Sequence, residues 1–233
     1  MVTGEFAPER LLGPLNEVEK KNAPPALFVS GRQELLKRRP RIAIIGSREA
    51  SPAGLQAAKE IAAAVVSRGG VVVSGLARGV DTAAHTSAME HGGDTIAVLG
   101  TPLSRAYPKE NAALQEKLKT EQLVVSQFRE DQATLPNSFV LRNRTMALVS
   151  NGSVIVEAGE ASGTQHQGWE ALRLGRVLFL PRSLAEGAFD WPRKMVSYGA
   201  LVFEGVEDFE GLLDEFLPQV PGRQAKEPSE LRF

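Results

Sequence analysis

The sequence predicts an α/β fold in which a mostly parallel β-sheet carries helices on both faces. From Arg41 to Pro181, short runs that are apolar throughout alternate with longer segments whose apolar residues recur at helical spacing. Strands of this continuously apolar kind are typical of a parallel sheet buried on both faces. No internal repeat is visible beyond the alternation. In such sheets ligands bind beyond the carboxyl ends of the strands, so we expect the site there.

The first half of the chain predicts a lone strand and three strand–helix units. The lone strand ends at Gly31, and the β-branched strand that follows residue 70 breaks at Gly75 before an alanine-rich helix, for which Asp81 is the expected N-cap. A turn containing Tyr107 and Pro108 separates the last strand from its helix. The expected elements are strand 26–30, strand 42–46, helix 52–68, strand 71–74, helix 81–91, strand 95–100 and helix 110–119.

The second half continues the alternation and ends in a closing unit. We expect residues 129–141 to form a loop and residues 200–216 to add an edge strand and a last helix. The remaining expected elements are strand 123–128, a helix near 142–150, strand 153–158, helix 165–174 and strand 177–181. The chain is thus divided into a lead-in over 1–40 with a short strand packed on the core, a core domain over 41–217, and a polar, proline-bearing tail over 218–233 that we expect to be disordered.

Composition excludes several classes of protein. The 233 residues include no cysteine, which excludes disulfides and thiolate metal sites and favours a reducing, cytoplasmic setting. No apolar run approaches the ~18 residues that span a bilayer, and the first ten residues lack the apolar core of a signal peptide. The three histidines are too scattered to suggest a metal site. Net charge is −1, so nucleic-acid binding would need a local cationic patch.

Two glycine-containing turns follow neighbouring strands of the predicted sheet. Gly46 lies in the first turn with Arg48, and Gly75 and Gly79 lie in the second with Arg78. Turns of this kind can bring backbone N–H groups close to a phosphate at a helix start. The alternative is that the glycines serve only tight turns and close packing of helix on sheet; the accompanying arginines favour ligand contact. Asp81 is expected to cap its helix or to fix Arg78.

Other cations fall at the same predicted edge of the sheet. Residues 132–156 contain Arg142 and Arg144 and no Asp or Glu, and Arg105 and Lys109 lie in a nearby loop. Several converging cations suit an extended phosphate backbone better than one phosphate group. Phe139 could stack on a base, a contact worth about 1–3 kcal/mol in single-strand binders.

The segments that carry these residues resemble the Rossmann-like core of the DprA/Smf family. The resemblance covers roughly residues 11–216 and rests on several motifs in the right order, namely 24-PPALFVSG-31, 46-GSR-48, 74-SGLARGVDTAAH-85, 99-LG-100, 107-YPKEN-111, 126-SQF-128, 139-FVLRNR-144, 156-VEA-158, 162-SG-163 and 198-YGALVFEGVEDF-209. It implies a Rossmann-like, doubly wound fold. It further implies a homodimer that binds single-stranded DNA and loads a RecA-type recombinase during natural transformation, without enzyme activity and without a cofactor.

The resemblance also assigns roles to individual residues. Arg48 and Lys109 match family positions that hold DNA phosphates, and 142-RNR-144 with Phe139 matches the segment that lines the strand-binding pocket. The complete set of predicted DNA-binding residues is Gly46, Ser47, Arg48, Gly75, Arg78, Gly79, Lys109, Asn111, Phe139, Arg142, Asn143, Arg144, Ser162 and Gly163. Thr164–Gln167 replaces the apolar-and-threonine stretch usual in the family, and residues 217–233 are shorter than the winged helix that many members carry.

Two functions are compatible with these residues. The favoured one is a cytoplasmic module that binds single-stranded DNA through backbone charge and base stacking, with no catalytic residue and no metal. The alternative is a sensor or hydrolase of a nucleotide-derived small molecule, with Arg48, Arg78 and Glu157 at its site. Against the alternative, no pair of carboxylates and no nucleophile–base pair stands out in the sequence.

Overall fold

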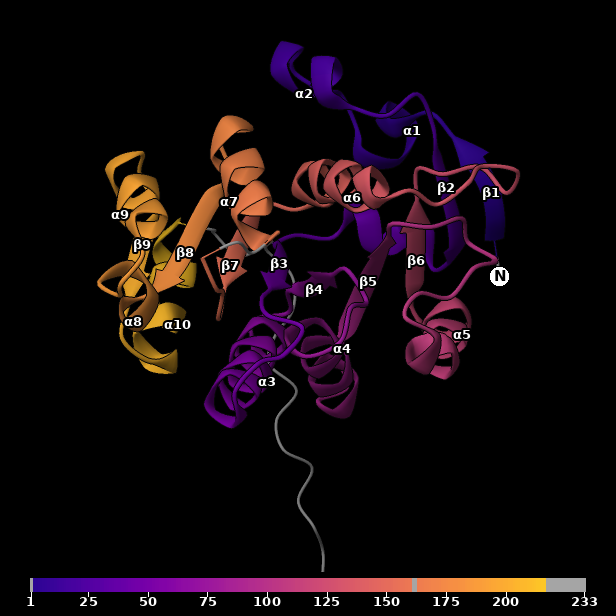
Figure 1. Ribbon diagram of the computed structural model, residues 1–233. Coiled ribbons are helices and arrows are strands. Elements are labelled where there is room, and N and C mark those ends of the chain that lie inside the picture. The colour runs from indigo at the N-terminus through magenta and orange to yellow at the C-terminus, as the bar shows by residue number, and fades with distance from the viewer. Residues whose placement is uncertain (1, 161–162, 217–233) are drawn as a thin grey trace, which may run out of the picture.

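The computed structural model describes residues 2–160 and 163–216, which form a single mixed sheet of nine strands in the order β1-β2-β6-β5-β4-β3-β7-β8-β9 (Figure 1). The strands are β1 (Val2–Phe6), β2 (Leu27–Gly31), β3 (Arg41–Ile45), β4 (Val71–Ser74), β5 (Asp94–Leu99), β6 (Leu123–Ser126), β7 (Gly152–Ile155), β8 (Val177–Pro181) and β9 (Leu201–Phe203). The predicted tail, 218–233, lies outside the described residues.

The parallel part of the sheet has a switch in strand order beside β3. All neighbouring pairs from β6 to β9 in the sheet order are parallel, whereas β2 is antiparallel to both β1 and β6. After β3 the chain adds β4, β5 and β6 on one side, and it then returns to place β7 on the other side. Loops that leave the carboxyl ends of β3 and β7 therefore diverge, and a crevice opens between them.

Helices cover both faces of the sheet, as the sequence predicts. One face carries α1 (Pro8–Leu12), η1 (Gln33–Lys37), α6 (Pro136–Val149), α7 (Thr164–Arg173), α8 (Arg182–Ala185) and α9 (Asp190–Ser197). The other face carries α3 (Pro52–Ser67), α4 (Val80–Glu90), α5 (Ala112–Glu121) and α10 (Val206–Phe216). The two remaining elements are α2 (Glu17–Asn22) and the short η2 (Lys109–Asn111). In Figure 1, α6 and α7 lie above the sheet and α3, α4 and α5 below it.

The alternation of side chains along the strands explains the two layers. In β3, Ile42 and Ile44 pack towards α3 and α4, whereas Ala43 and Ile45 pack towards α6. All four side chains are almost completely buried, which accounts for the uninterrupted apolar run in the sequence. The predicted fold class, a doubly wound and mostly parallel α/β sheet, is confirmed.

Several predicted boundaries are wrong. Residues 136–141, assigned to a loop, form the first turns of α6, because Pro136 occupies the first helical turn, where its missing N–H costs nothing. Asp81 is not the N-cap of α4; Gly79 holds that position and Asp81 lies in the first turn. The strand β1 and the helices α8 and α9 are absent from the prediction; each is short, at eight residues or fewer.

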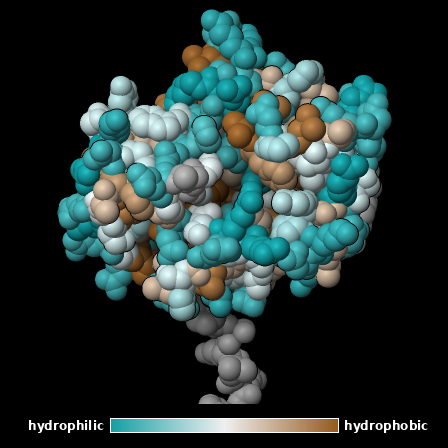
Figure 2. Space-filling model, in the orientation of Figure 1, coloured by the Kyte–Doolittle hydropathy of each residue, from teal (hydrophilic) through white to brown (hydrophobic). Residues whose placement is uncertain are grey.

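The surface shown in Figure 2 is mainly hydrophilic, with hydrophobic residues in small groups. No helix of the described part of the chain is long and apolar enough to cross a membrane.

Candidate nucleic-acid interface

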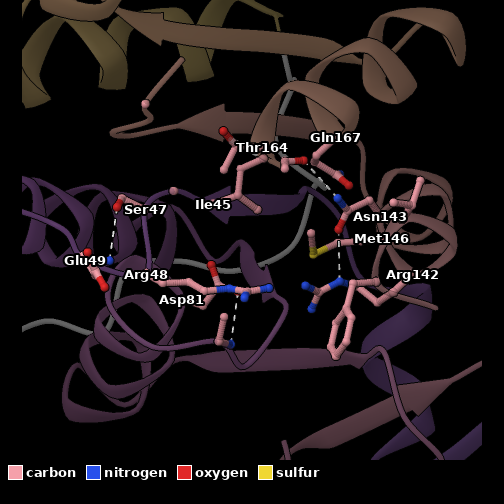
Figure 3. Close-up of a pocket in the computed structure, with 16 residues that line it drawn as sticks. Ile45, Ser47, Arg48, Glu49, Asp81, Arg142, Asn143, Met146, Thr164 and Gln167 are labelled. Carbon is pink, nitrogen blue, oxygen red and sulfur yellow. Dashed lines mark hydrogen bonds between the residues drawn. The ribbon is translucent and has the colours of Figure 1, made fainter. Parts of the chain in front are cut away.

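A cavity of about 540 Å³ lies at the carboxyl ends of the strands, beside the switch in strand order. Its walls come from the turns after β3 and β4, one face of α6, and the start of α7. Figure 3 shows Arg48 and Arg142 entering it from opposite sides with their guanidinium groups pointing toward one another. The strand order alone predicts a ligand site at this position.

Glu157 holds the turn that presents Arg48. Its backbone carbonyl accepts a hydrogen bond from the Ser47 amide at 2.7 Å. Its carboxylate accepts one from the Ser51 amide at 2.9 Å and another from the Ser51 hydroxyl at 2.5 Å. The absence of a side chain at Gly54 makes room for this carboxylate. Glu157 therefore fixes both ends of the turn.

Arg48 itself is exposed and available to an anion. Its guanidinium lies over the ring of Phe139, with 5.8 Å between Cζ and the ring centroid. No carboxylate within the described ranges forms an ion pair with it. A cation over an aromatic face is weakly held, so it can turn towards a phosphate at little cost.

The two glycine turns meet, as the parallel sheet predicts. The Val80 amide donates to the Ser47 carbonyl at 3.2 Å. A Cβ atom at Gly46 would overlap Val80, and one at Gly79 would overlap the Ser47 carbonyl; Gly79 also has a φ of +70°. Both glycines thus permit the two turns to cross in contact, which is the packing role left open in the sequence.

Gly75 is committed to internal contacts. Its amide donates to Asp81 at 3.1 Å, and its carbonyl accepts from Nη1 of Arg142 at 2.5 Å. The Asp81 carboxylate also accepts from the Ala77 amide at 3.2 Å. Asp81 therefore stabilises the turn before its helix, and the polar backbone atoms of Gly75 are used within the protein.

Arg142 is a buried cation, only 6% exposed, at the floor of the cavity. Nη1 also donates to the Val98 carbonyl at 3.0 Å, and Nε donates to Oδ1 of Asn143 at 3.0 Å. Nη2 has no hydrogen-bond partner among the residues that the structure describes. Burial lowers the pKa of Arg142 and raises the pKa of Asp81, and the opposite charge of each partly offsets the shift of the other. The nearby charge of Arg48 lowers the pKa of Arg142 further.

Residues after β5 support the second turn from outside the cavity. The Asn111 side-chain amide donates to the Leu76 carbonyl and to Oγ1 of Thr82, each at 2.9 Å, and it is almost completely buried. Its role is to hold the turn, in which Leu76 has a φ of +58°. Lys109 is exposed and forms no ion pair within the described ranges. Arg78 is exposed too, but it pairs with Glu110 at 2.6 Å.

The remaining predicted DNA-binding residues lie partly in the cavity wall and partly outside it. Asn143 lines the cavity and donates to the Gly163 carbonyl at 3.1 Å. Arg144 does not line it, and its Nε atom lies 3.1 Å from Oε1 of Glu170. Glu170 also pairs with Arg173. Ser162 lies outside the described residues.

The altered segment 164–167 supplies part of the cavity wall. Thr164 and Gln167 both line it. The Gln167 amide, oriented to satisfy its neighbours, donates to the Asn143 carbonyl at 2.5 Å and accepts from the Ala147 amide at 3.2 Å. Gln167 therefore attaches the start of α7 to α6.

Tyr107 belongs to the same surface and is absent from the predicted set. Its ring centroid lies 5.0 Å from that of Phe139, with the planes inclined at 45°. The sequence signal was available, because Tyr107 opens the motif 107-YPKEN-111, but a Tyr-Pro pair is also a common turn, and no local pattern places it beside Phe139.

Comparison with known proteins shows the family of this chain. The family model of DNA recombination-mediator protein A matches residues 8–214. DNA processing protein DprA of Streptococcus pneumoniae is 36% identical over 188 residues, which cover 80% of this chain and 66% of that protein. The chain thus spans slightly less than two thirds of this relative's length.

Solved structures of DNA processing protein A also match this chain. The crystal structure of DprA from Streptococcus pneumoniae matches with a TM-score of 0.76 at 31% identity, over 92% of this chain and 74% of that chain. DNA processing protein A from Helicobacter pylori, a structure concerned with its single-stranded DNA binding mode, matches with a TM-score of 0.77 at 25% identity, over 92% and 97% of the two chains. The chain therefore belongs to the DNA recombination-mediator protein A family, also called DprA/Smf.

Proposed function

We propose that this chain binds single-stranded DNA at the cavity between β3 and β7 and that it acts in DNA processing and recombination. The observation that carries the proposal is the pair of guanidinium groups, from Arg48 and Arg142, that face each other across the cavity. Like charges held close repel one another, and an anion between them removes this cost. A phosphate of the strand is the anion that the family relationship favours.

We propose three roles for the predicted DNA-binding residues. Residues that line the cavity or lie beside it are proposed to touch DNA, namely Gly46, Ser47, Arg48, Gly79, Lys109, Phe139, Arg142, Asn143 and Gly163. Gly75 and Asn111 are proposed to hold the turn, because their polar groups are engaged inside the protein. Arg78 and Arg144 are ion-paired and are proposed to contribute through long-range attraction.

The proposed activity is binding without bond chemistry. Asp81 and Glu157 each accept hydrogen bonds from the backbone, and Glu49, the other carboxylate that lines the cavity, is exposed to solvent, so none of the three forms a nucleophile–base pair. The family relationship adds a RecA-type recombinase as partner, a homodimer as the working state and the cytoplasm as location, and we include these in the proposal.

Fluorescence anisotropy tests the proposal against the nucleotide alternative. Labelled single strands, duplexes of the same length and a labelled mononucleotide are titrated with the full chain across a salt series. We expect submicromolar-to-micromolar affinity for single strands, with a steep negative dependence on salt. Tight mononucleotide binding without affinity for the oligonucleotide would instead support a sensor or hydrolase of a nucleotide-derived molecule.

A further inference from the structure

A second aromatic ring extends the proposed site beyond the cavity. The Tyr107 side chain is exposed, at 49%, yet its ring contacts Phe139. Phe139 in turn lies beneath Arg48 on the cavity side. The three side chains form a continuous series in the order Arg48, Phe139, Tyr107, which we call the stacking series.

The backbone fixes where this series lies. Gly100 follows β5 directly, and a Cβ atom there would overlap the Phe139 ring. The ring therefore rests on the backbone at the carboxyl end of β5. Lys109 is two residues beyond Tyr107, exposed and without an ion pair in the described part of the chain. The stacking series thus has Arg48 at its cavity end, and Lys109 follows its other end, Tyr107, by two residues along the chain.

The opposite direction along the sheet edge has the opposite charge. A second cavity, of about 480 Å³, lies at the carboxyl ends of β7, β8 and β9. Its lining includes the carboxylates of Glu60, Glu157 and Glu204 and no lysine, arginine or histidine. A phosphate chain crossing this cavity would be repelled by the carboxylates of Glu60 and Glu157, whereas Glu204 is paired with Arg182.

We infer that the bound strand leaves the first cavity over the carboxyl end of β5, with bases stacked on Phe139 and Tyr107 and phosphates near Arg48 and Lys109, and that it does not cross β8 and β9. The inference rests on the proposed function. It adds the direction of the strand and identifies Tyr107 as a base-contacting residue. Stacking on a ring is independent of base identity, because every base has a π-face. We therefore expect Phe139 and Tyr107 to bind single strands of any sequence.

The test separates base stacking from support of the fold. Tyr107→Leu, Tyr107→Phe and the matched control Tyr198→Leu are compared with the wild type, since Tyr198 is 72% exposed and also contacts one ring, Trp169. Each protein is titrated with a thymidine oligonucleotide and with an oligonucleotide of the same length in which abasic residues replace the bases. Thermal unfolding by circular dichroism verifies that each variant is folded.

We expect Tyr107→Leu to weaken binding of the thymidine strand by about 5- to 100-fold and to leave abasic binding within about twofold of the wild type. Tyr107→Phe and Tyr198→Leu should bind both strands like the wild type. Equal losses on both strands, or no loss on either, would overturn the role of Tyr107 while leaving single-strand binding intact. Absence of binding by the wild type would instead refute the proposed function.

Two charge-reversal variants test the direction of the bound strand. Lys109→Glu should weaken binding and make the salt dependence less steep, because it removes a phosphate contact. Glu60→Lys, in the second cavity, should leave the affinity within about twofold. A rise in affinity with a steeper salt dependence in Glu60→Lys, together with an unaffected Lys109→Glu, would show that the strand runs the other way.

Discussion

The guanidinium group of Arg142 occupies the space that any side chain at position 75 would need. The Gly75 carbonyl accepts from this group, and the Gly75 amide donates to Asp81. The turn at Gly75, for which the sequence suggests phosphate binding, is thus occupied by the side chain of a buried arginine. Its function is to fix that arginine at the floor of the cavity.

Gly75→Ala is therefore expected to destabilise the protein. The added methyl group must displace Arg142, and overpacking of this kind costs about 1–3 kcal/mol in the free energy of unfolding. Urea denaturation measures the change. Gly211→Ala is the matched control, because a Cβ there meets open space within α10 and should stabilise that helix by up to about 1 kcal/mol. Equal stability of the two variants would contradict the packing described here.

Arg48→Ala should weaken single-strand binding more than Arg144→Ala does. Arg48 has no carboxylate partner in the described ranges, whereas Arg144 is compensated by Glu170. We expect a loss of about 5- to 30-fold for Arg48→Ala, with the salt slope reduced by about one, and less than threefold for Arg144→Ala. Arg193→Ala, which removes an exposed arginine paired with Asp190, is the control and should change neither quantity.

Glu157→Gln should weaken DNA binding through the position of Arg48. The amide cannot accept from both the amide and the hydroxyl of Ser51, so the turn after β3 loses part of its support. We expect a loss of up to about tenfold, equivalent to one good hydrogen bond. The salt slope should stay at the wild-type value because no cation is removed. A slope reduced as in Arg48→Ala would show that Glu157 acts by another route.

His85 predicts a dependence of stability on pH. Oγ1 of Thr95 donates to the Val72 carbonyl, so it accepts from Nδ1 of His85 at 2.7 Å. Nε2 is then the site of protonation, and it is buried without a partner among the described residues. Burial lowers the pKa of His85 to about 3. Since the unfolded chain takes up this proton near pH 6.5, stability contributed by neutral His85 is present above that pH and lost progressively down to about pH 3.

The expected slope is up to about 1.4 kcal/mol per pH unit between these two values. His85→Gln cannot take up the proton and should show a shallower dependence in urea denaturation at several pH values. Burial of Asp81, which raises the pKa of that carboxyl, acts in the opposite direction. The test is therefore the difference in pH dependence between the wild type and His85→Gln. Parallel curves of unfolding free energy against pH would contradict the role of His85.

Much of the site could be predicted from the sequence, for a physical reason. Parallel strands bring their carboxyl ends to one edge, so Gly46, Arg48 and Gly79 could be placed together without knowing a single long-range contact. The continuous apolar strands fixed the sheet, and the acid-free window around Arg142 indicated an anionic ligand.

The remaining details depend on packing between distant segments. The start of α6 was missed because Pro136 and Asn137 are typical of a loop, although a proline is compatible with a first helical turn. The burial of Arg142 and the pairing of Arg144 depend on which face of α6 meets the sheet. That face could not be predicted while residues 129–141 were assigned to a loop. The contact of Tyr107 with Phe139 joins two loops that no local pattern relates.

Photocrosslinking tests the central claim, the location of the strand, most directly. A single strand carrying 5-iododeoxyuridine is irradiated with the wild-type protein, and the modified peptides are identified by mass spectrometry. We predict crosslinks to the peptides that contain Phe139 and Tyr107, and their loss in Arg48→Ala. Crosslinks confined to α9, β9 and α10, at the other end of the sheet, would contradict the account.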